Sequence, residues 1–415
     1  MFACVLTYAC TLTDSLGRGG GEGLSLGYSP VPTMGRLLRP DARRYGVSRY
    51  TRHYTVVRTW EASWSLCLLQ WEGRLIATHY AAPMADSNKI AIIEFGGTIA
   101  RRGRDGLDLV AYADSGMSYP ASALVAEVPE IRTAGDIVCV PLRHDGLGVD
   151  VTGADWMALR QAIEDIADAD DSVAGFVVLH GTATIEETAY FLNLTLKTRT
   201  PVVVTGSLRP PSSYSSDAVM NLIHSVRVAR ASEVYGQGVL VVMDQTIHAA
   251  RDVTKMSKYY LDAFTSPNAG PIGHIDHDRV VLHRRTPLHP SCIDTEFTVN
   301  SATTLPRVDI TFSYAGSDGT AITAYVEAGA RAIVNASFAP GGETPGERRA
   351  IANALAAGVH TIRSSRAPVG RIIPRNSDEM IFANDLAPAK ARILAMLGLT
   401  VTSDRTCLQR MFDTY

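Results

Sequence analysis

The stretch AGFVVLHGTATIEETAYFLNLTLKTRTPVVVTG (174–206) contains the pattern that decides the fold. AGFVVLH (174–180) and TPVVVTG (200–206) are short apolar runs, as expected of strands that are buried on both faces. Between them, EETAYFLNLTLK (186–197) carries apolar residues at helical spacing. A strand, a helix and a second strand in this order predict a parallel βαβ unit.

The same alternation extends in both directions from this unit. Further strands are predicted over KIAIIEF (89–95), DIVCVPL (136–142) and QGVLVVMD (237–244), and helices over 154–168 and 217–231. A stretch rich in proline, serine and threonine follows near residues 283–306 and is typical of a linker. After it the alternation resumes, with predicted strands over 308–314, 332–338 and 360–366 and predicted helices over 320–330, 346–358 and 387–399.

We therefore expect an α/β protein with two α/β domains and largely parallel sheets. The larger, N-terminal domain covers residues 84–285, a linker covers 286–306, and the smaller, C-terminal domain covers 307–415. At 415 residues the chain is long enough for two such domains.

Residues 1–83 differ from the rest of the chain. The first lysine is Lys89, and three of the four tryptophans fall before it. No sustained helical or strand period appears over residues 15–44, and the first residues lack the basic start of a signal peptide. A targeting or regulatory arm is one interpretation. We favour an irregular, disordered extension, because Met84 opens MADSNKIAIIEFGG (84–97) as a natural start would.

Composition excludes several classes of function. The net charge is −3 and 20% of the residues are charged, so nothing favours nucleic acid or an anionic membrane as a partner. No apolar run is long enough to span a bilayer. The six cysteines are far apart and show no CxxC spacing, which indicates thiols in a reducing compartment and a cytoplasmic location.

Three polar segments follow predicted strands and carry the candidate chemistry. They are Gly96-Gly97-Thr98, the stretch from His180 to Thr184, and the stretch from Arg251 to Lys255. In open α/β sheets, ligands bind at the carboxyl ends of the strands. A threonine hydroxyl becomes a useful nucleophile when a base or a lysine of lowered pKa lies within hydrogen-bond reach. For each segment taken singly, composition favours a structural interpretation, namely a turn, a helix N-cap and a solvated loop in that order.

Other catalytic patterns are weaker. GHIDHD (273–278) fits no zinc spacing and is more typical of a strand and a turn, so no metal site is expected. No segment matches the GxSxG turn of serine hydrolases.

Together the three segments resemble the bacterial L-asparaginases. The resemblance rests on EFGGTIA (94–100), on residues 179–210 and on VLVVMDQTIHAARDVTK (239–255), and it continues through FTSPNAGPIGHI (264–275). ITFSYAGSDGTAI (310–322) and TIRSSRAPVGRI (361–372) extend it into the second domain. It covers about Lys89 to the C-terminus, and residues 1–83 have no counterpart.

The resemblance implies roles for four residues. Thr98 corresponds to the family's nucleophile, and Tyr112 is the best match to a tyrosine that assists it. Thr182 and Lys255 correspond to a second catalytic group. The family hydrolyses small-molecule amides through a covalent acyl-enzyme and releases ammonia, without metal or organic cofactor. Its sites lie near subunit interfaces, so a homo-oligomer, a dimer or a tetramer, is implied.

The substrate pocket departs from the family pattern. Where the family has HGTDT, this chain has HGTAT, so Ala183 replaces an aspartate that pairs with the lysine and holds the substrate's α-ammonium. Removing one partner of a buried charge pair typically costs roughly 3–5 kcal/mol. The family's Ser-Gln pair for the α-carboxylate falls near 142–148, where this chain places Arg143 and His144. Asp244, at the end of a predicted strand, is a candidate to steady Lys255 instead.

The loop after Thr98 carries Arg101, Arg102 and Arg104. They form either a solvated lid or a recognition site for a second carboxylate, since guanidinium matches carboxylate in a bidentate fork.

Three functions remain open at this point. The first is hydrolysis of L-asparagine or a related small carboxylic-acid amide. The second is hydrolysis of an anionic amide that lacks an α-amino group, as the loss of the aspartate at Ala183 would suit. The third is a degenerate family member that binds a ligand without turnover, which the presence of Thr98, Thr182 and Lys255 disfavours.

Overall fold

The computed structural model describes residues 7–11, 53–57, 64–71, 74–81 and 89–415, apart from 115–116, 134, 143–147, 287–288, 290 and 375–378. Residues 1–86 and 87–415 form separate compact units. In the first unit, β1 (Thr7–Thr11), β2 (His53–Val57), β3 (Trp64–Trp71) and β4 (Arg74–Ala81) pair antiparallel in sequence order. These strands fall within the expected irregular extension, and the sequence analysis did not predict them.

An eight-stranded sheet forms the centre of the larger domain, in the order β14-β13-β10-β9-β8-β7-β5-β6. Its parallel part consists of the five predicted strands, namely β5 (Lys89–Glu94), β6 (Asp136–Pro141), β7 (Val173–Leu179), β8 (Val202–Thr205) and β9 (Val239–Met243). One edge is antiparallel and consists of β10 (Thr246–Ala249), β13 (Gly273–Asp276) and β14 (Arg279–Leu282). The sheet is therefore mixed, with its parallel strands at the site described below.

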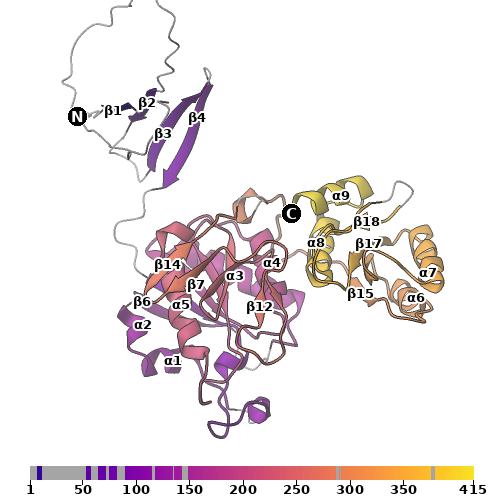
Figure 1. The fold of residues 1–415 in the computed structure, drawn as a ribbon, viewed down its shortest axis with the longest axis horizontal. Helices are drawn as coiled ribbons and strands as arrows, with labels where there is room; N and C mark the ends of the chain where they lie inside the picture. The colour runs from indigo at the N-terminus through magenta and orange to yellow at the C-terminus, as the bar shows by residue number, and fades with distance from the viewer. Residues whose placement is uncertain are drawn as a thin grey trace, which may run out of the picture. The chain divides into compact units, whose positions relative to one another are not determined.

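Helices cover both faces of this sheet because successive residues of its strands point to opposite sides and both sides are apolar. Ile90 and Ile92 of β5 pack in one buried cluster, and Ala91 and Ile93 pack in another. The first cluster includes side chains of α1 (Ala121–Glu127), α2 (Glu130–Thr133) and α5 (Ala218–Arg230). The second includes those of α3 (Gly153–Ala169) and α4 (Ile185–Thr195). Figure 1 shows these helices around the sheet.

The smaller domain has a four-stranded, wholly parallel sheet of β15 (Val308–Phe312), β16 (Ala332–Ser337), β17 (His360–Ser365) and β18 (Ile381–Phe382). Its helices are α6 (Thr320–Glu327), α7 (Pro345–Ala356), α8 (Pro388–Val401) and α9 (Arg405–Thr414). The predicted strands and helices of this domain are confirmed. The strand β18 was not predicted because it is only two residues long. The helix α9 was not predicted because it buries only Leu408, Met411 and Phe412 and is otherwise polar.

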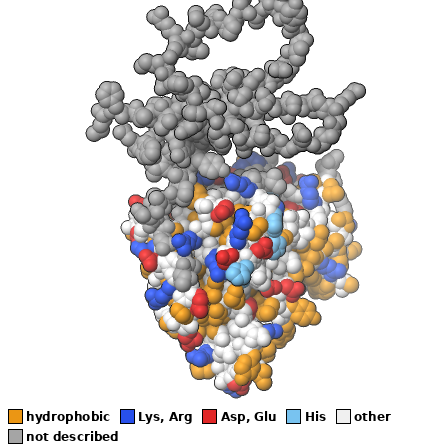
Figure 2. Space-filling model, turned by 60° about the vertical axis from the view of Figure 1, so that its left-hand side comes forward, with side chains coloured by type: hydrophobic (Ala, Val, Ile, Leu, Met, Phe, Trp, Pro, Cys, Tyr) orange, Lys and Arg blue, Asp and Glu red, His pale blue; other side chains and the backbone are white. Residues whose placement is uncertain are grey.

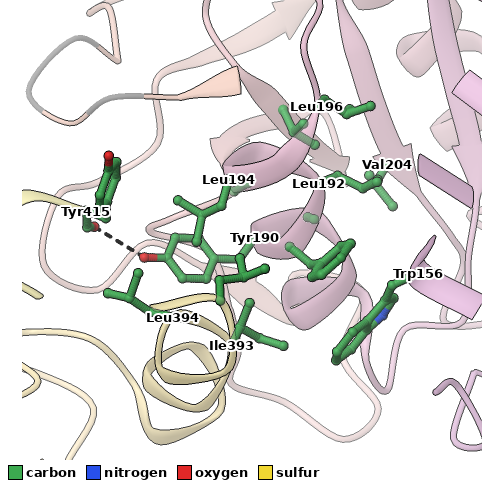
Figure 3. Packing of buried hydrophobic residues seen from close by; sticks show 14 of the residues in the cluster. Trp156, Tyr190, Leu192, Leu194, Leu196, Val204, Ile393, Leu394 and Tyr415 are labelled. Carbon is green, nitrogen blue, oxygen red and sulfur yellow. Dashed lines mark hydrogen bonds between the residues drawn. The ribbon is translucent and has the colours of Figure 1, made fainter. Parts of the chain in front are cut away.

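The two domains share one hydrophobic core. Helix α8 contacts β15, β16 and β17 on one side and α4 of the larger domain on the other. Figure 3 shows the Tyr190 ring of α4 beside Ile393 and Leu394 of α8, and its hydroxyl donates to the Tyr415 carbonyl oxygen at 3.3 Å. The expected linker joins this core as well, since Phe297 and Val299 are buried within it. The linker is therefore packed between the domains along part of its length.

The remaining short elements lie in loops: the 3-10 helices η1 (Thr98–Ala100), η2 (Ala111–Ala113), η3 (Ser232–Val234) and η4 (Cys292–Asp294), and the ribbon of β11 (Thr254–Lys255) and β12 (Phe264–Thr265). Within the described part of the chain, no helix is both long and apolar enough to cross a membrane. On the face drawn in Figure 2, basic and acidic side chains are interspersed with apolar ones.

Candidate active site

Two glycine-rich turns meet at the carboxyl ends of β5 and β7, which are neighbours in the sheet. Gly97 lies between β5 and η1 with a φ of 92°, a backbone conformation that favours glycine. A Cβ atom on Gly97 would come within 2.4 Å of the Cα atom of Gly181. The turns that carry Thr98 and Thr182 therefore touch through their backbones, and a larger residue at Gly97 would separate them.

Thr98 and Tyr112 are brought together as predicted. The two hydroxyl oxygens lie 2.9 Å apart, and either group can donate. Thr98 is 8% exposed and Tyr112 is partly buried. Tyr112 belongs to η2, in a loop whose two ends are joined by the antiparallel bridge between Arg101 and Ser118. The loop that begins at Thr98 therefore folds back, so that Tyr112 contacts the same threonine.

Thr182 and Lys255 form a second pair. The ammonium nitrogen of Lys255 donates to the hydroxyl oxygen of Thr182 at 2.7 Å. The route to Lys255 differs from the expected one, in which the strand predicted over 237–244 leads to the segment from Arg251 to Lys255. The strand β10 intervenes and runs antiparallel to β9, so Lys255 reaches the site on the separate β11–β12 ribbon.

Burial lowers the pKa of Lys255, because desolvation disfavours the ammonium form, and the negative charge of Glu186 partly offsets this effect. Glu186 lies in the first turn of α4, four residues after Thr182. The Phe264 ring of β12 lies 6.0 Å from the Lys255 nitrogen. Asp244 occupies the turn between β9 and β10, and it is Glu186 rather than Asp244 whose charge acts on Lys255.

The methyl group of Ala183 is exposed beside the buried Thr182. The next residue, Thr184, donates its hydroxyl hydrogen to the carbonyl oxygen of Gly148. A Cβ atom on Gly148 would come within 2.7 Å of the Cα atom of Gly181, so this loop also touches the turn through its backbone. The two other predicted pocket residues, Arg143 and His144, lie outside the described residues.

The three arginines of the loop after Thr98 have different environments. Arg101 is buried, whereas Arg102 and Arg104 are exposed. The Arg102 guanidinium lies 5.3 Å from the centre of the Tyr119 ring, a cation–π distance. The backbone nitrogen of Arg104 donates to the Asp108 carboxylate at 3.1 Å. The environment of Arg104 fits a solvated lid, and the burial of Arg101 does not.

Among the residues that the structure describes, no cluster of three or more His, Cys, Asp and Glu side chains could hold a metal ion. GHIDHD forms the hairpin of β13 and β14 with His277 in the turn at a φ of 57°, which confirms the predicted strand and turn. Cys139, Cys292 and Cys407 are free thiols.

Sequence reasoning missed the electrostatic role of Glu186, which it noted only as the start of a helix. The available signal was the Glu186-Glu187 pair directly after HGTAT, since carboxylates in the first turn of a helix lie next to the residues that precede it. It also missed Gly206, where a Cβ atom would come within 2.4 Å of the His180 carbonyl oxygen.

Comparison with known proteins accounts for this arrangement. Residues 89–288 match the family Asparaginase, N-terminal, and residues 307–412 match the Glutaminase/Asparaginase C-terminal domain. The chain is 36% identical to a glutaminase-asparaginase of Pseudomonas fluorescens biotype A over 79% of this chain and 90% of that relative. It is 35% identical to L-asparaginase 2 of Bacillus subtilis strain 168 over 82% of this chain and 90% of the relative.

A solved structure also matches this chain and comes from the same family. The probable cytoplasmic L-asparaginase from Campylobacter jejuni matches with a TM-score of 0.75 and 34% identity, covering 79% of this chain and 100% of that chain. From two consecutive domain matches and a shared two-domain fold, we conclude that the chain belongs to the asparaginase family of amidohydrolases.

Proposed function

We propose that this protein hydrolyses the side-chain amide of L-asparagine or of a related small carboxylic-acid amide, with Thr98 as the nucleophile. The observation that carries the proposal is the contact between two turns at neighbouring strand ends, each of which carries a hydroxyl group within hydrogen-bond distance of a group that can move a proton. Thr98 has Tyr112 at 2.9 Å, and Thr182 has Lys255 at 2.7 Å.

In the first step the Thr98 oxygen attacks the amide carbonyl carbon, and its proton passes through Tyr112 towards the leaving nitrogen. The carbon–nitrogen bond breaks, ammonia leaves, and an ester to Thr98 remains. In the second step water attacks this ester, and the carboxylic acid leaves as the Thr98 hydroxyl re-forms. We assign activation of this water to the Thr182–Lys255 pair, since burial lowers the pKa of Lys255 and favours the neutral amine.

Ala183 favours a second candidate, hydrolysis of an anionic amide without an α-amino group. An exposed methyl group at this position provides no counter-ion for a substrate ammonium. The carboxylate that acts on Lys255 is Glu186, which leaves Lys255 with a negative partner even without the family's aspartate.

Ammonia release from a panel of amides, with and without α-amino groups, tests the proposal. The panel pairs L-asparagine with succinamic acid, and L-glutamine with glutaramic acid. Faster turnover of the α-amino member supports the first candidate, and faster turnover of the des-amino member supports the second. Ligand binding without ammonia release from any member would indicate a degenerate, non-catalytic protein.

We further propose a cytoplasmic homo-oligomer, a dimer or a tetramer. Large apolar side chains are exposed near the end of β15, where Phe312 is 57% and Tyr314 is 59% exposed. Exposed patches of this kind mark protein contacts more often than chance. Light scattering on the eluting protein would give the mass directly, and a monomer of 44.7 kDa would contradict the oligomer.

A further inference from the structure

Lys390 of helix α8 is buried in the second domain and only 1% exposed. Its ammonium nitrogen donates to the carbonyl oxygen of Arg251 at 2.8 Å and to that of Val253. Its third neighbour is the Glu186 carboxylate, with an oxygen at 3.9 Å. The ammonium group therefore makes two hydrogen bonds to backbone carbonyl oxygens and one longer ion pair with a carboxylate.

Both carbonyl groups belong to the segment that leads into Lys255. Val253 precedes Lys255 by two residues, which is about 7 Å of extended chain. By binding the carbonyl oxygens of Arg251 and Val253, Lys390 therefore fixes the backbone that leads into β11. This fixes the position of the Lys255 Cα atom, from which the side chain extends.

Glu186 follows Thr182, the hydrogen-bond partner of Lys255, by four residues, and its carboxylate also pairs with Lys390. The ion pair with Lys390 crosses the domain boundary, and the negative charge of Glu186 acts on Lys255 within the site. Its carboxylate sits in the first turn of α4, where the helix dipole also stabilises negative charge. A single carboxylate thus connects the buried lysine of the second domain to the lysine of the first.

We propose that Lys390 and Glu186 are positioning residues for Lys255, so that the second domain supports the catalytic lysine of its own chain through a buried ammonium group. This role rests on the proposed function, in which Lys255 takes part in turnover. In this arrangement Glu186 supplies the negative charge near Lys255 that an aspartate at position 183 would otherwise provide.

The charges around both lysines come from few elements. Lys255 experiences the negative charge of Glu186 of α4, lies 6.0 Å from the Phe264 ring and donates to the Thr182 hydroxyl. Lys390 is faced by Glu186, by Asp252 and Arg251 of the adjoining loop, and by Asp385 of its own domain. Burial lowers the pKa of Lys390 to about 8, so it is protonated at neutral pH.

The same two helices provide a matched control. Arg392, two residues after Lys390, pairs with Glu187, the residue after Glu186, at 3.6 Å. Arg392 also donates to the carbonyl oxygen of Val308, in the second domain, at 2.8 Å. This second ion pair crosses the same α4–α8 boundary but has no contact with the segment from Arg251 to Lys255 among its described interactions.

The test is a direct titration of lysine side chains. The chain has only five lysines, at positions 89, 197, 255, 258 and 390, so protein labelled with 13C at the lysine Cε gives five signals. Loss of one signal in Lys255→Met assigns Lys255. Its titration midpoint is then measured in the full-length parent and in four variants, Glu186→Gln, Glu187→Gln, Lys390→Met and Arg392→Met, together with kcat, KM and thermal midpoint.

We expect Glu186→Gln to lower the titration midpoint of Lys255, because a negative charge is removed near it. At a pH where Lys255 is neutral in both proteins, the variant should still lower kcat about tenfold or more with little change in KM, because the amine loses the carboxylate that positions it. Glu187→Gln should leave both values unchanged. Lys390→Met should lower kcat similarly, and Arg392→Met should not, although both variants lose thermal stability.

Equal effects of the Glu186→Gln and Glu187→Gln variants on the Lys255 midpoint and on kcat would overturn the proposal. If Lys390→Met does not fold, the comparison of the two glutamate variants decides the matter alone, since neither leaves a backbone carbonyl without its partner. Normal turnover in Lys255→Met would contradict the proposed function. The Lys255 midpoint in Glu186→Gln would still test the electrostatic interaction between the two side chains, because that readout needs no activity.

Discussion

The two turns that carry Thr98 and Thr182 touch through their glycines, yet they obtain their activating groups in different ways. Tyr112 reaches Thr98 from within the same loop, 14 residues further along the chain. Lys255 reaches Thr182 from 73 residues away, after an antiparallel hairpin, on a segment that the second domain holds through Lys390. The Thr98–Tyr112 pair forms within one loop, whereas the Thr182–Lys255 pair depends on contacts between segments that are distant in the sequence. We therefore expect substrate choice to be set at the second turn, which carries Ala183.

The largest expected effect lies at the first turn. Thr98→Ala should reduce kcat on the order of 10³-fold or more while the thermal midpoint stays near that of the parent, because only the attacking oxygen is lost. Steady-state ammonia release gives the rate. Retained turnover would move the nucleophile elsewhere, and Thr182 would be the next candidate.

A smaller loss, about 10²–10⁴-fold in kcat, is expected for Lys255→Met. The pH dependence of kcat distinguishes the Thr182–Lys255 pair from the Thr98–Tyr112 pair more clearly than the size of the loss in kcat does. Lys255 acts as a base only when neutral, and its pKa is lowered by burial, so kcat in the parent should rise with pH through a midpoint below 10.5.

Lys255→Met should abolish that limb of the profile, whereas Tyr112→Phe should reduce the rate and keep the limb. A limb that persists in Lys255→Met would assign the titration to another group and break the distinction between the two pairs.

The Ala183→Asp substitution tests substrate choice at the second turn. It should raise kcat/KM for L-asparagine and lower kcat/KM for succinamic acid, because the new carboxylate attracts an ammonium and repels an anion. The ratio should change by about two to three orders of magnitude, at 1.4 kcal/mol per tenfold. Asparagine turnover at ordinary family efficiency in the parent, with no change on substitution, would show that Ala183 does not set the substrate.

The smallest effect is expected from removal of the N-terminal segment, which precedes the family matches. A chain that starts at Met84 should keep the thermal midpoint and the kcat of the full chain, because residues 1–86 form a compact unit of their own and the family matches begin at residue 89. Calorimetry and ammonia release on both proteins compare them. A large loss in either would assign residues 1–83 a structural or catalytic role.

Much of the fold was predictable because its strands are uniformly apolar and its helices have a regular period. KIAIIEF gave a buried strand at 89–94, and residues 154–168 gave a helix at 153–169. The strand β10 and the helix α9 were missed for opposite reasons. β10 is four residues long, too short for a period, and α9 is amphipathic but mostly polar.

For the candidate site, the family resemblance predicted roles for both threonines, the tyrosine and the lysine. The structure places these side chains in two hydrogen-bonded pairs, and their roles stay predictions. The contribution of Glu186 and Lys390 could not be read from the sequence, because it arises where α4 and α8 pack and these helices are about 200 residues apart in the chain. A lysine within the apolar stretch APAKARILAMLGL was the one visible signal.

The most direct test of a Thr98 acyl-enzyme is to trap it. The Thr182→Ala variant, which should slow attack by water more than attack by Thr98, is mixed with the best amide of the panel, quenched in acid within seconds, digested and measured by mass spectrometry. We predict that the acyl group is found on the peptide that contains Thr98, and that the double variant Thr98→Ala, Thr182→Ala carries none. An acyl group on any other residue, with Thr98 unmodified, would contradict the account.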